Sequence, residues 1–214
     1  MRIHRKLLAV LGTALLTFAA RAEIYVAASG DGSDGTTWAT AYTNLQAAVD
    51  VATNGATILV KSGAYAAETE VAILNRAGLT IRGGYAGTAP EPGDTTNEPT
   101  ILTRGASPAR ILSAYASTVT IERITVQNGY LNAPYSQGGG LLFTNNCDVT
   151  LRQCVVTNNL ILAEWGNQGG GLYINGGWLN VFDCVFVNDS VRKLSWDTYS
   201  YGGAIFAQGT AVTI

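Results

Sequence analysis

The feature that most constrains this chain is an internal repeat of 30 residues. Three ten-residue stretches, 119–128, 149–158 and 179–188, read VTIERITVQN, VTLRQCVVTN and LNVFDCVFVN and align at that constant offset. A second element, three small residues followed by an aliphatic one, recurs in the same order. It is found at Gly138–Leu141, Gly169–Leu172 and Gly202–Ile205. Repeats of this length indicate units that stack, because one unit alone cannot bury its apolar face.

Within each copy, apolar and polar residues alternate with the period of two that marks a strand with one buried face. The alternation breaks at 122–123, 152–153 and 182–183, where we expect a tight corner. A further strand begins at each glycine element, so each copy is predicted to hold three short strands joined by turns. We therefore expect an all-β fold, a parallel β-helix in which each strand pairs with its counterpart one coil away.

One helix is predicted, over 43–53, because its apolar residues recur at helical spacing and Gly55 stands where a capping glycine belongs. The preceding stretch, SGDGSDGT at 29–36, is a turn cluster. Its Asp31 and Asp34 offer carboxylates that Ca²⁺ could use, but their spacing does not match an EF-hand loop, and a turn explains them better. No metal or cofactor is expected from the sequence.

Residues 1–22 are predicted to be a cleaved signal peptide. Basic residues precede an apolar run at 7–20, and Ala20-Arg21-Ala22 has the small-x-small pattern of a cleavage site. The run is short for a membrane span, although a retained N-terminal anchor is the alternative. We expect the chain to be exported, to the extracellular space or the outer membrane surface, with no transmembrane segment in its mature part.

Composition excludes several kinds of site. His4 is the only histidine and lies in the predicted signal peptide, so Ser-His-Asp, Cys-His and histidine-ligated zinc sites are not expected in the mature chain. Charged residues make up 13% of the chain. This low fraction argues against a partner made of nucleic acid, whose phosphates require many basic side chains.

Two columns of identical residues follow from the 30-residue register. One is expected to form a ladder of side-chain hydrogen bonds at a bend, and consists of Asn128, Asn158 and Asn188. The other contains Cys154 and Cys184, whose Cα atoms should lie one strand spacing apart. A disulfide is within reach there, but stacked thiols are favoured because neighbours in register rarely present suitable dihedral angles. Cys147 has no cysteine in its register.

Between the Asn column and the glycine element the chain is predicted to leave the coil, over 130–137, 160–168 and 190–201. These excursions carry six aromatic residues: Tyr130, Tyr135, Trp165, Trp196, Tyr199 and Tyr201. Insertions at one place in successive coils lie on one face of a solenoid, often its binding face. Exposed rings there suit sugars or protein partners, whereas the alternative is that the rings fold back over the outer wall of the sheet.

Acidic residues do not gather in the outward columns. Glu122 is expected to stack on Arg152, and Asp183 shares a column with Arg123 and Gln153. We interpret both columns as surface charge pairing and assign no catalytic residue.

Two parts of the chain resemble known families. The segments Ile24-Tyr25-Val26, Leu45–Val49 and Gly63-Ala64-Tyr65 resemble the N-terminal cap of secreted right-handed β-helix proteins of the pectate-lyase-like superfamily. Gly202-Gly203-Ala204-Ile205 and Phe143-Thr144-Asn145-Asn146 are similar to the two elements of polymorphic outer membrane protein repeats. The resemblance implies a right-handed β-helix, export, and a passenger domain on a bacterial surface.

The resemblance and the repeats together predict three parts: a signal peptide at 1–22, a cap and first coil at 23–65, and β-helix coils at 66–214. Because the chain stops at Ile214 inside a strand, we expect it to be a fragment. The favoured function is an adhesin-like module that binds glycans or host partners. The alternatives are a polysaccharide lyase or glycosidase with catalytic coils beyond residue 214, and a passive stalk.

Overall fold

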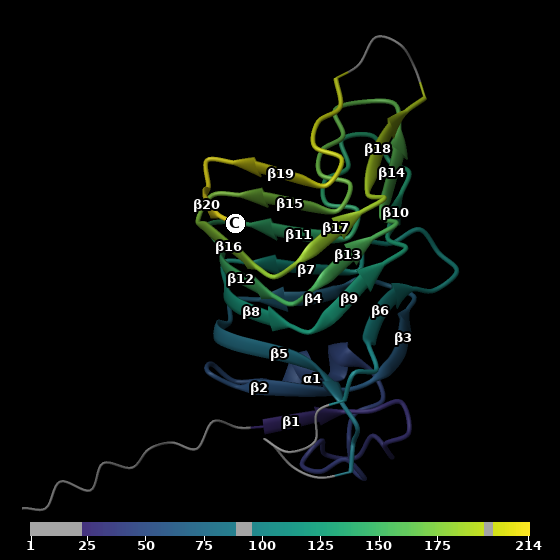
Figure 1. The fold of residues 1–214 in the computed structure, drawn as a ribbon, viewed down its shortest axis with the longest axis vertical. Coiled ribbons are helices and arrows are strands. Elements are labelled where there is room, and N and C mark those ends of the chain that lie inside the picture. Colours follow the sequence, from purple (N-terminus) through teal and green to yellow (C-terminus); the bar gives the residue numbers. More distant parts are fainter. Residues whose placement is uncertain (1–22, 89–95, 195–198) are drawn as a thin grey trace, which may run out of the picture.

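A computed structural model describes residues 23–88, 96–194 and 199–214. The predicted signal peptide and Trp196 lie outside these ranges. The described part is all-β apart from the single helix α1 (Leu45–Val51), and every strand pairing in it is parallel. Figure 1 shows the strands stacked in layers along the longest axis of the molecule.

The strands form four sheets. Sheet A contains β1 (Glu23–Val26), β2 (Thr57–Lys61), β5 (Ala77–Tyr85), β8 (Thr118–Glu122), β12 (Asp148–Arg152), β16 (Trp178–Phe182) and β20 (Ala211–Thr213). Sheet B contains β3 (Gly63–Ala67), β6 (Thr100–Arg104), β9 (Ile124–Gln127), β13 (Val155–Thr157) and β17 (Val185–Val187). Sheet C contains β4 (Val71–Leu74), β7 (Leu112–Tyr115), β11 (Leu141–Thr144), β15 (Leu172–Asn175) and β19 (Ile205–Gln208). Sheet D contains β10 (Tyr130–Leu131), β14 (Leu160–Ala163) and β18 (Ser190–Lys193).

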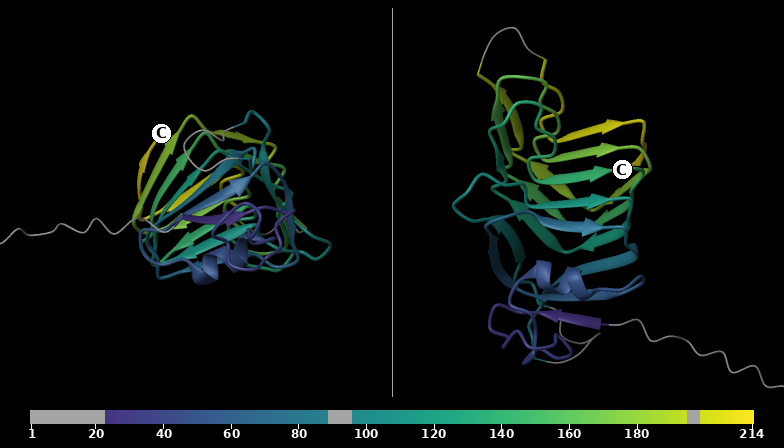
Figure 2. Two further views of the ribbon diagram at one scale, coloured as in Figure 1. Left: turned by 90° about the horizontal axis from the view of Figure 1, so that it is seen from below. Right: turned by 180° about the vertical axis from the view of Figure 1, so that it is seen from behind.

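The predicted register is confirmed. In sheet A, Val149 pairs with Val119 on one side and with Leu179 on the other. In sheet B, Val156 likewise lies between Val126 and Phe186. The apolar columns therefore run along the molecule and form one core, shared by sheets A, B and C. Figure 2 shows from two further sides how the strands of successive layers lie above one another.

The corner between sheets A and B is made by residues in the left-handed backbone region. Arg123, Gln153 and Asp183 have φ values of 53°, 50° and 53°. One residue in this conformation per repeat reverses the side-chain alternation without a loop, which explains why the period of two breaks at these positions.

The predicted Asn column is not the one that carries the ladder. Asn128, Asn158 and Asn188 are exposed and have positive φ, so they form a second left-handed corner. Asn128 Nδ2 donates to Thr103 Oγ1 in the preceding layer at 3.4 Å, but the buried side-chain hydrogen bonds at this corner come from the next column. There Asn159, fully buried, accepts from Gly129 N at 2.8 Å and donates to Val126 O at 3.2 Å and to Asp189 Oδ1 at 2.8 Å.

The excursions contain a fourth strand per repeat, where three strands were predicted. The first residues of each excursion pair in parallel as β10, β14 and β18. Sheet D stands beside the other three sheets along the same axis (Figure 1). The prediction of loops was therefore wrong for these residues, because the backbone groups of aligned excursions satisfy one another.

Helix α1 is shorter than predicted. It begins at Leu45, after Asn44 caps it by accepting from Ala47 N at 2.9 Å, and it ends at Val51 because Ala52 has an extended ψ of 133°. Gly55 has positive φ but lies in the following turn, not at the capping position. The buried side of the helix, with Leu45, Ala48 and Val49, covers one end of the core.

Among the described residues, no helix has the length and apolar character needed to cross a membrane.

Candidate functional site

The aromatic residues of the excursions separate into three groups. Tyr135 and Trp165 form the first, at the same place in consecutive excursions. The Tyr135 N–H donates to the Trp165 carbonyl at 2.7 Å, and the Tyr135 ring lies against Gly166, where a methyl group would approach a ring atom at 2.7 Å. Tyr135 is 71% exposed and Trp165 46%. Tyr135 and Trp165 are thus joined across adjoining layers by their backbones, and both side chains are exposed.

The second group folds back over sheet C. Tyr199 stacks on Tyr201 with centroids 6.3 Å apart, Tyr201 contacts the Phe206 ring at 5.9 Å, and Phe206 stacks on Tyr173 at 5.6 Å. Tyr173 lies on the outer face of β15 and is nevertheless buried. Tyr201 therefore follows the alternative given above, in which the rings fold back over the outer wall of the sheet. Tyr199, at the end of the stack, is 76% exposed.

Tyr130 is apart from both groups. It opens β10 and is half-buried, with the Arg104 guanidinium 5.5 Å from its ring centroid. Both residues line a surface groove of about 330 Å³ that also involves Asn128 and Asn158. Trp196 lies outside the described residues, so the structure brings together two pairs of the six predicted residues and separates Tyr130.

A second groove, of about 390 Å³, lies at the corner between sheets A and B. Its lining residues are Arg82, Tyr85, Glu122, Arg123, Arg152, Gln153 and Asp183. Glu122 is in register with Arg152 as predicted, but its ion pair is formed with Arg82 in the preceding layer, at 2.6 Å. The sequence does not single out Arg82, because the insertion at 86–99 places it 40 residues, and not 30, before its register partner Glu122. Nor does it single out Tyr85, which has no register partner in β8.

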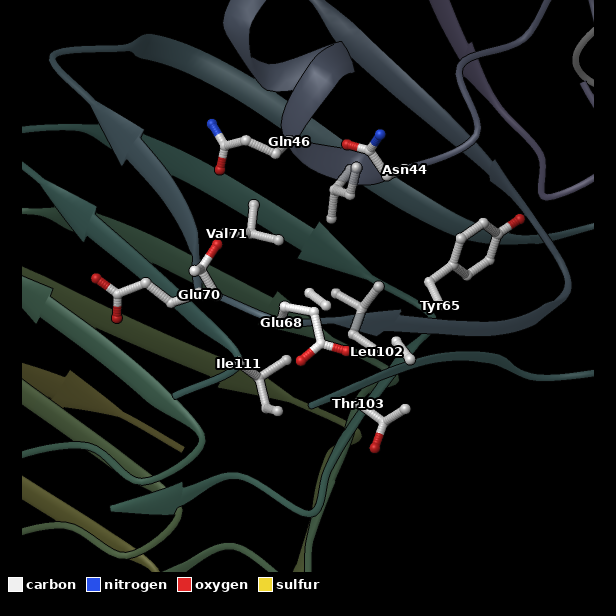
Figure 3. A pocket seen from close by; sticks show the side chains of 13 residues that line it. Asn44, Gln46, Tyr65, Glu68, Glu70, Val71, Leu102, Thr103 and Ile111 are labelled. Atoms are coloured by element: carbon white, nitrogen blue, oxygen red, sulfur yellow. The ribbon is translucent and has the colours of Figure 1, made fainter. Parts of the chain in front are cut away.

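A third hollow, of about 240 Å³, lies where α1 meets the turn between β3 and β4 (Figure 3). Leu102, Ile111 and Val71 line it on the core side, and Glu68 and Glu70 lie at its edge. The two carboxylates point to different sides in Figure 3. Glu70 pairs with Arg110 and accepts from Ser113 Oγ at 3.2 Å.

Tyr65 lines the same hollow. Its hydroxyl donates to Lys61 O at 2.9 Å. Burial raises the pKa of Tyr65 to about 12, so that this group stays protonated at neutral pH.

The cysteines are free thiols, in the stacked arrangement that was favoured from the sequence. The Cys154 N–H donates to Cys184 Sγ at 3.3 Å, and Cys147 is buried with its thiol donating to Thr144 O at 3.1 Å. Hydrogen bonding to the neighbouring sulfur, together with burial, raises the pKa of Cys154, whereas the Cys154 thiol stabilises the Cys184 thiolate and lowers its pKa. Cys184 is also the less buried thiol of the pair.

Asp31 and Asp34 form the turn expected of them. Asp31 accepts from Ser33 N and Oγ at 2.9 and 2.6 Å, and Asp34 accepts from Thr36 N and Oγ1 at 2.9 Å each. Hydrogen bonds from Ser33 lower the pKa of the Asp31 carboxyl. The pKa of the Asp34 carboxyl is also lowered, mainly by a hydrogen bond from Thr40. Within residues 23–88, 96–194 and 199–214, no three His, Cys, Asp or Glu side chains are grouped so as to hold a metal ion.

Comparison with known proteins returns no match, whether the chain is set against protein-family models, curated proteins or solved structures.

Proposed function

We propose that this chain is a right-handed parallel β-helix that is exported and binds glycans at a cell surface. Parallel strands joined by crossover connections are right-handed in about 98% of cases, which supports the handedness. The all-parallel pairing and the repeated order of sheets A, B, D and C support the solenoid.

The observation that carries the binding role is the pair formed by Tyr135 and Trp165. Both side chains are exposed, and the 2.7 Å backbone hydrogen bond joins their residues across adjoining layers. Exposed apolar surface that gathers on one face of a molecule is typical of interaction sites. Exposed flat rings offer contact area at low entropic cost and suit the apolar faces of sugar rings. Tyr199, exposed at the end of its own stack, extends the same kind of surface.

The test is affinity electrophoresis through gels that contain neutral or acidic polysaccharides. We expect retardation by at least one polysaccharide, and a Tyr135→Ala/Trp165→Ala variant should bind about tenfold more weakly or worse, as for buried aromatic anchors. Trp178→Ala is the matched control, because Trp178 is 61% exposed on sheet A, away from the excursions.

Three outcomes would contradict this proposal. Retardation that survives the double substitution would remove these rings from the contact face, and equal loss in Trp178→Ala would indicate nonspecific adhesion. Release of unsaturated sugars from the polysaccharide would favour the lyase alternative.

A further inference from the structure

We propose that the corner groove between sheets A and B binds a tetrahedral oxyanion group, sulfate or phosphate, through Arg82, Arg123, Arg152 and Tyr85. This site is separate from the excursions and does not depend on glycan binding by their aromatic rings.

The groove concentrates positive charge in a chain whose net charge is −2. Three arginines from three successive layers line it, against one Glu and one Asp. Arg82 comes from β5, Arg123 follows β8, and Arg152 ends β12, so the guanidinium groups approach from different levels of the stack. A tetrahedral anion presents oxygens in several directions and can use donors from more than one level.

The side chain of Arg152 is positioned so that it could bind a ligand. Its guanidinium lies over the Phe182 ring, 4.4 Å from the centroid, which fixes the plane of the group. Within the described part of the chain its N–H groups make no hydrogen bond or ion pair, although Asp183 lines the same groove. When an aromatic ring packs against the flat face of a guanidinium group, the N–H groups along the edge can still donate hydrogen bonds. This arrangement suits the binding of oxyanions.

Tyr85 supplies an independent observation. It lines the groove and is 0% exposed, and its hydroxyl has no hydrogen-bond partner among the described residues. A buried hydroxyl without a partner costs free energy. The Arg123 guanidinium lies over the Tyr85 ring, 5.1 Å from its centroid, so the two residues share one part of the groove. For a ligand oxygen to reach the hydroxyl, the Arg123 side chain must move.

The experiment is a calorimetric titration of the whole chain with inorganic sulfate and inorganic phosphate, in chloride buffer at fixed ionic strength. We expect saturable 1:1 binding. Arg152→Gln should weaken it about tenfold or more, because a charge-assisted hydrogen bond is lost. The control Arg192→Gln removes an exposed arginine on β18 of sheet D, which does not line this groove, and should leave the affinity unchanged.

Tyr85→Phe separates binding from folding. If the hydroxyl serves an anion, this variant binds sulfate more weakly while its thermal stability without ligand is equal to or above that of the parent, because an unsatisfied buried group has been removed. Glucose 6-sulfate, compared with inorganic sulfate and with glucose, distinguishes the source. Tighter binding of the ester indicates an anionic group carried by a larger molecule, and equal binding indicates the free ion.

The proposal is overturned if none of these oxyanions binds saturably, or if Arg152→Gln binds them as tightly as the parent chain. Loss of anion binding in the Tyr135→Ala/Trp165→Ala variant would also overturn it, since the two sites would then be one.

Discussion

At the scale of single residues, polar side chains at the corners determine how successive layers are joined. Asn159 is the clearest case, because it satisfies the N–H of Gly129 and the carbonyl of Val126, one layer away, in a site with no access to water. Its neighbour Asn158 is exposed and has a φ of 56°. The two adjacent asparagines thus have different structural roles.

We expect Asn159→Ala to lower the free energy of unfolding by about 3 kcal/mol, since two buried backbone groups lose their partner. Asn158→Ala is the matched control and should cost about 1 kcal/mol, because alanine lacks the short polar side chain whose local hydrogen bonds let asparagine adopt the left-handed region. Chemical denaturation of both variants measures the difference. Equal losses would show that the buried ladder contributes nothing beyond the corner conformation.

Asp189 occupies the position of Asn159 in the next layer, but its carboxylate has no N–H group to donate, unlike the Asn159 amide. Burial raises the pKa of Asp189, and its Oδ2 has no partner among the described residues. An amide in its place would donate to the Val156 carbonyl, as Asn159 donates to Val126. We therefore expect Asp189→Asn to raise the free energy of unfolding at pH 7 by about 1 kcal/mol.

The pH dependence follows from the same shift. Because the folded-state pKa is above the ordinary value of 3.8, the contribution of Asp189 to stability is greatest at pH below 3.8 and declines as the pH rises through the folded-state pKa. In the Asp189→Asn variant, this decline in stability with rising pH should be absent. Unfolding curves recorded between about pH 3 and pH 7, the range in which carboxyl groups titrate, would measure the difference. A variant with the same pH profile as the parent would contradict the assignment.

At the scale of elements, the glycine triplets set how closely sheet D approaches sheet C. A β-carbon on Gly170 would lie 2.5 Å from the Gly203 carbonyl oxygen and 2.6 Å from the Ser190 carbonyl. Both contacts are with backbone, which cannot move without opening the adjoining layers. Small residues are therefore required where the excursion returns to the stack.

Gly170→Ala should lower the free energy of unfolding by about 3 kcal/mol through this clash. Gly203→Ala, in the next layer, meets its nearest atom at 3.2 Å and should cost less than about 1 kcal/mol. Thermal unfolding of the two variants tests the difference. Similar melting temperatures would show that the layers separate more easily than the contacts indicate.

The elements also show which predictions can be made from one sequence. The strands at 119–122, 149–152 and 179–182 were predictable because each repeat has the same apolar alternation. Sheet D was not, because β10 is only two residues long and no alternation marks it. Its strands exist because aligned excursions pair with one another, which is a property of the stack and not of any one segment.

At the scale of the whole molecule, stability is expected to vary along the axis. β12 is hydrogen-bonded to β8 on one side and to β16 on the other, and its inward residues are fully buried. Among the strands that the structure describes, β20 pairs with β16 alone, and all three of its residues are exposed. In repeat architectures each layer is stabilised by its immediate neighbours.

Hydrogen exchange followed by mass spectrometry should therefore find the amides of β8 and β12 most protected and those of β20 least protected. Equal protection along residues 23–214 would instead indicate a single cooperative unit.

The sequence alone determined the repeat length, the register of the copies from residue 119 onward, and the tight corner at 122–123, 152–153 and 182–183, since each is written as a column of aligned residues. It also located the aromatic residues on the excursions. Only the tertiary structure decided which rings face solvent and which cover sheet C, which asparagine column is buried, and that Arg82 and Tyr85 join Arg152 in one groove. The physical reason is that these features depend on contacts between layers whose separation along the chain is altered by insertions, and no local pattern records where an insertion returns.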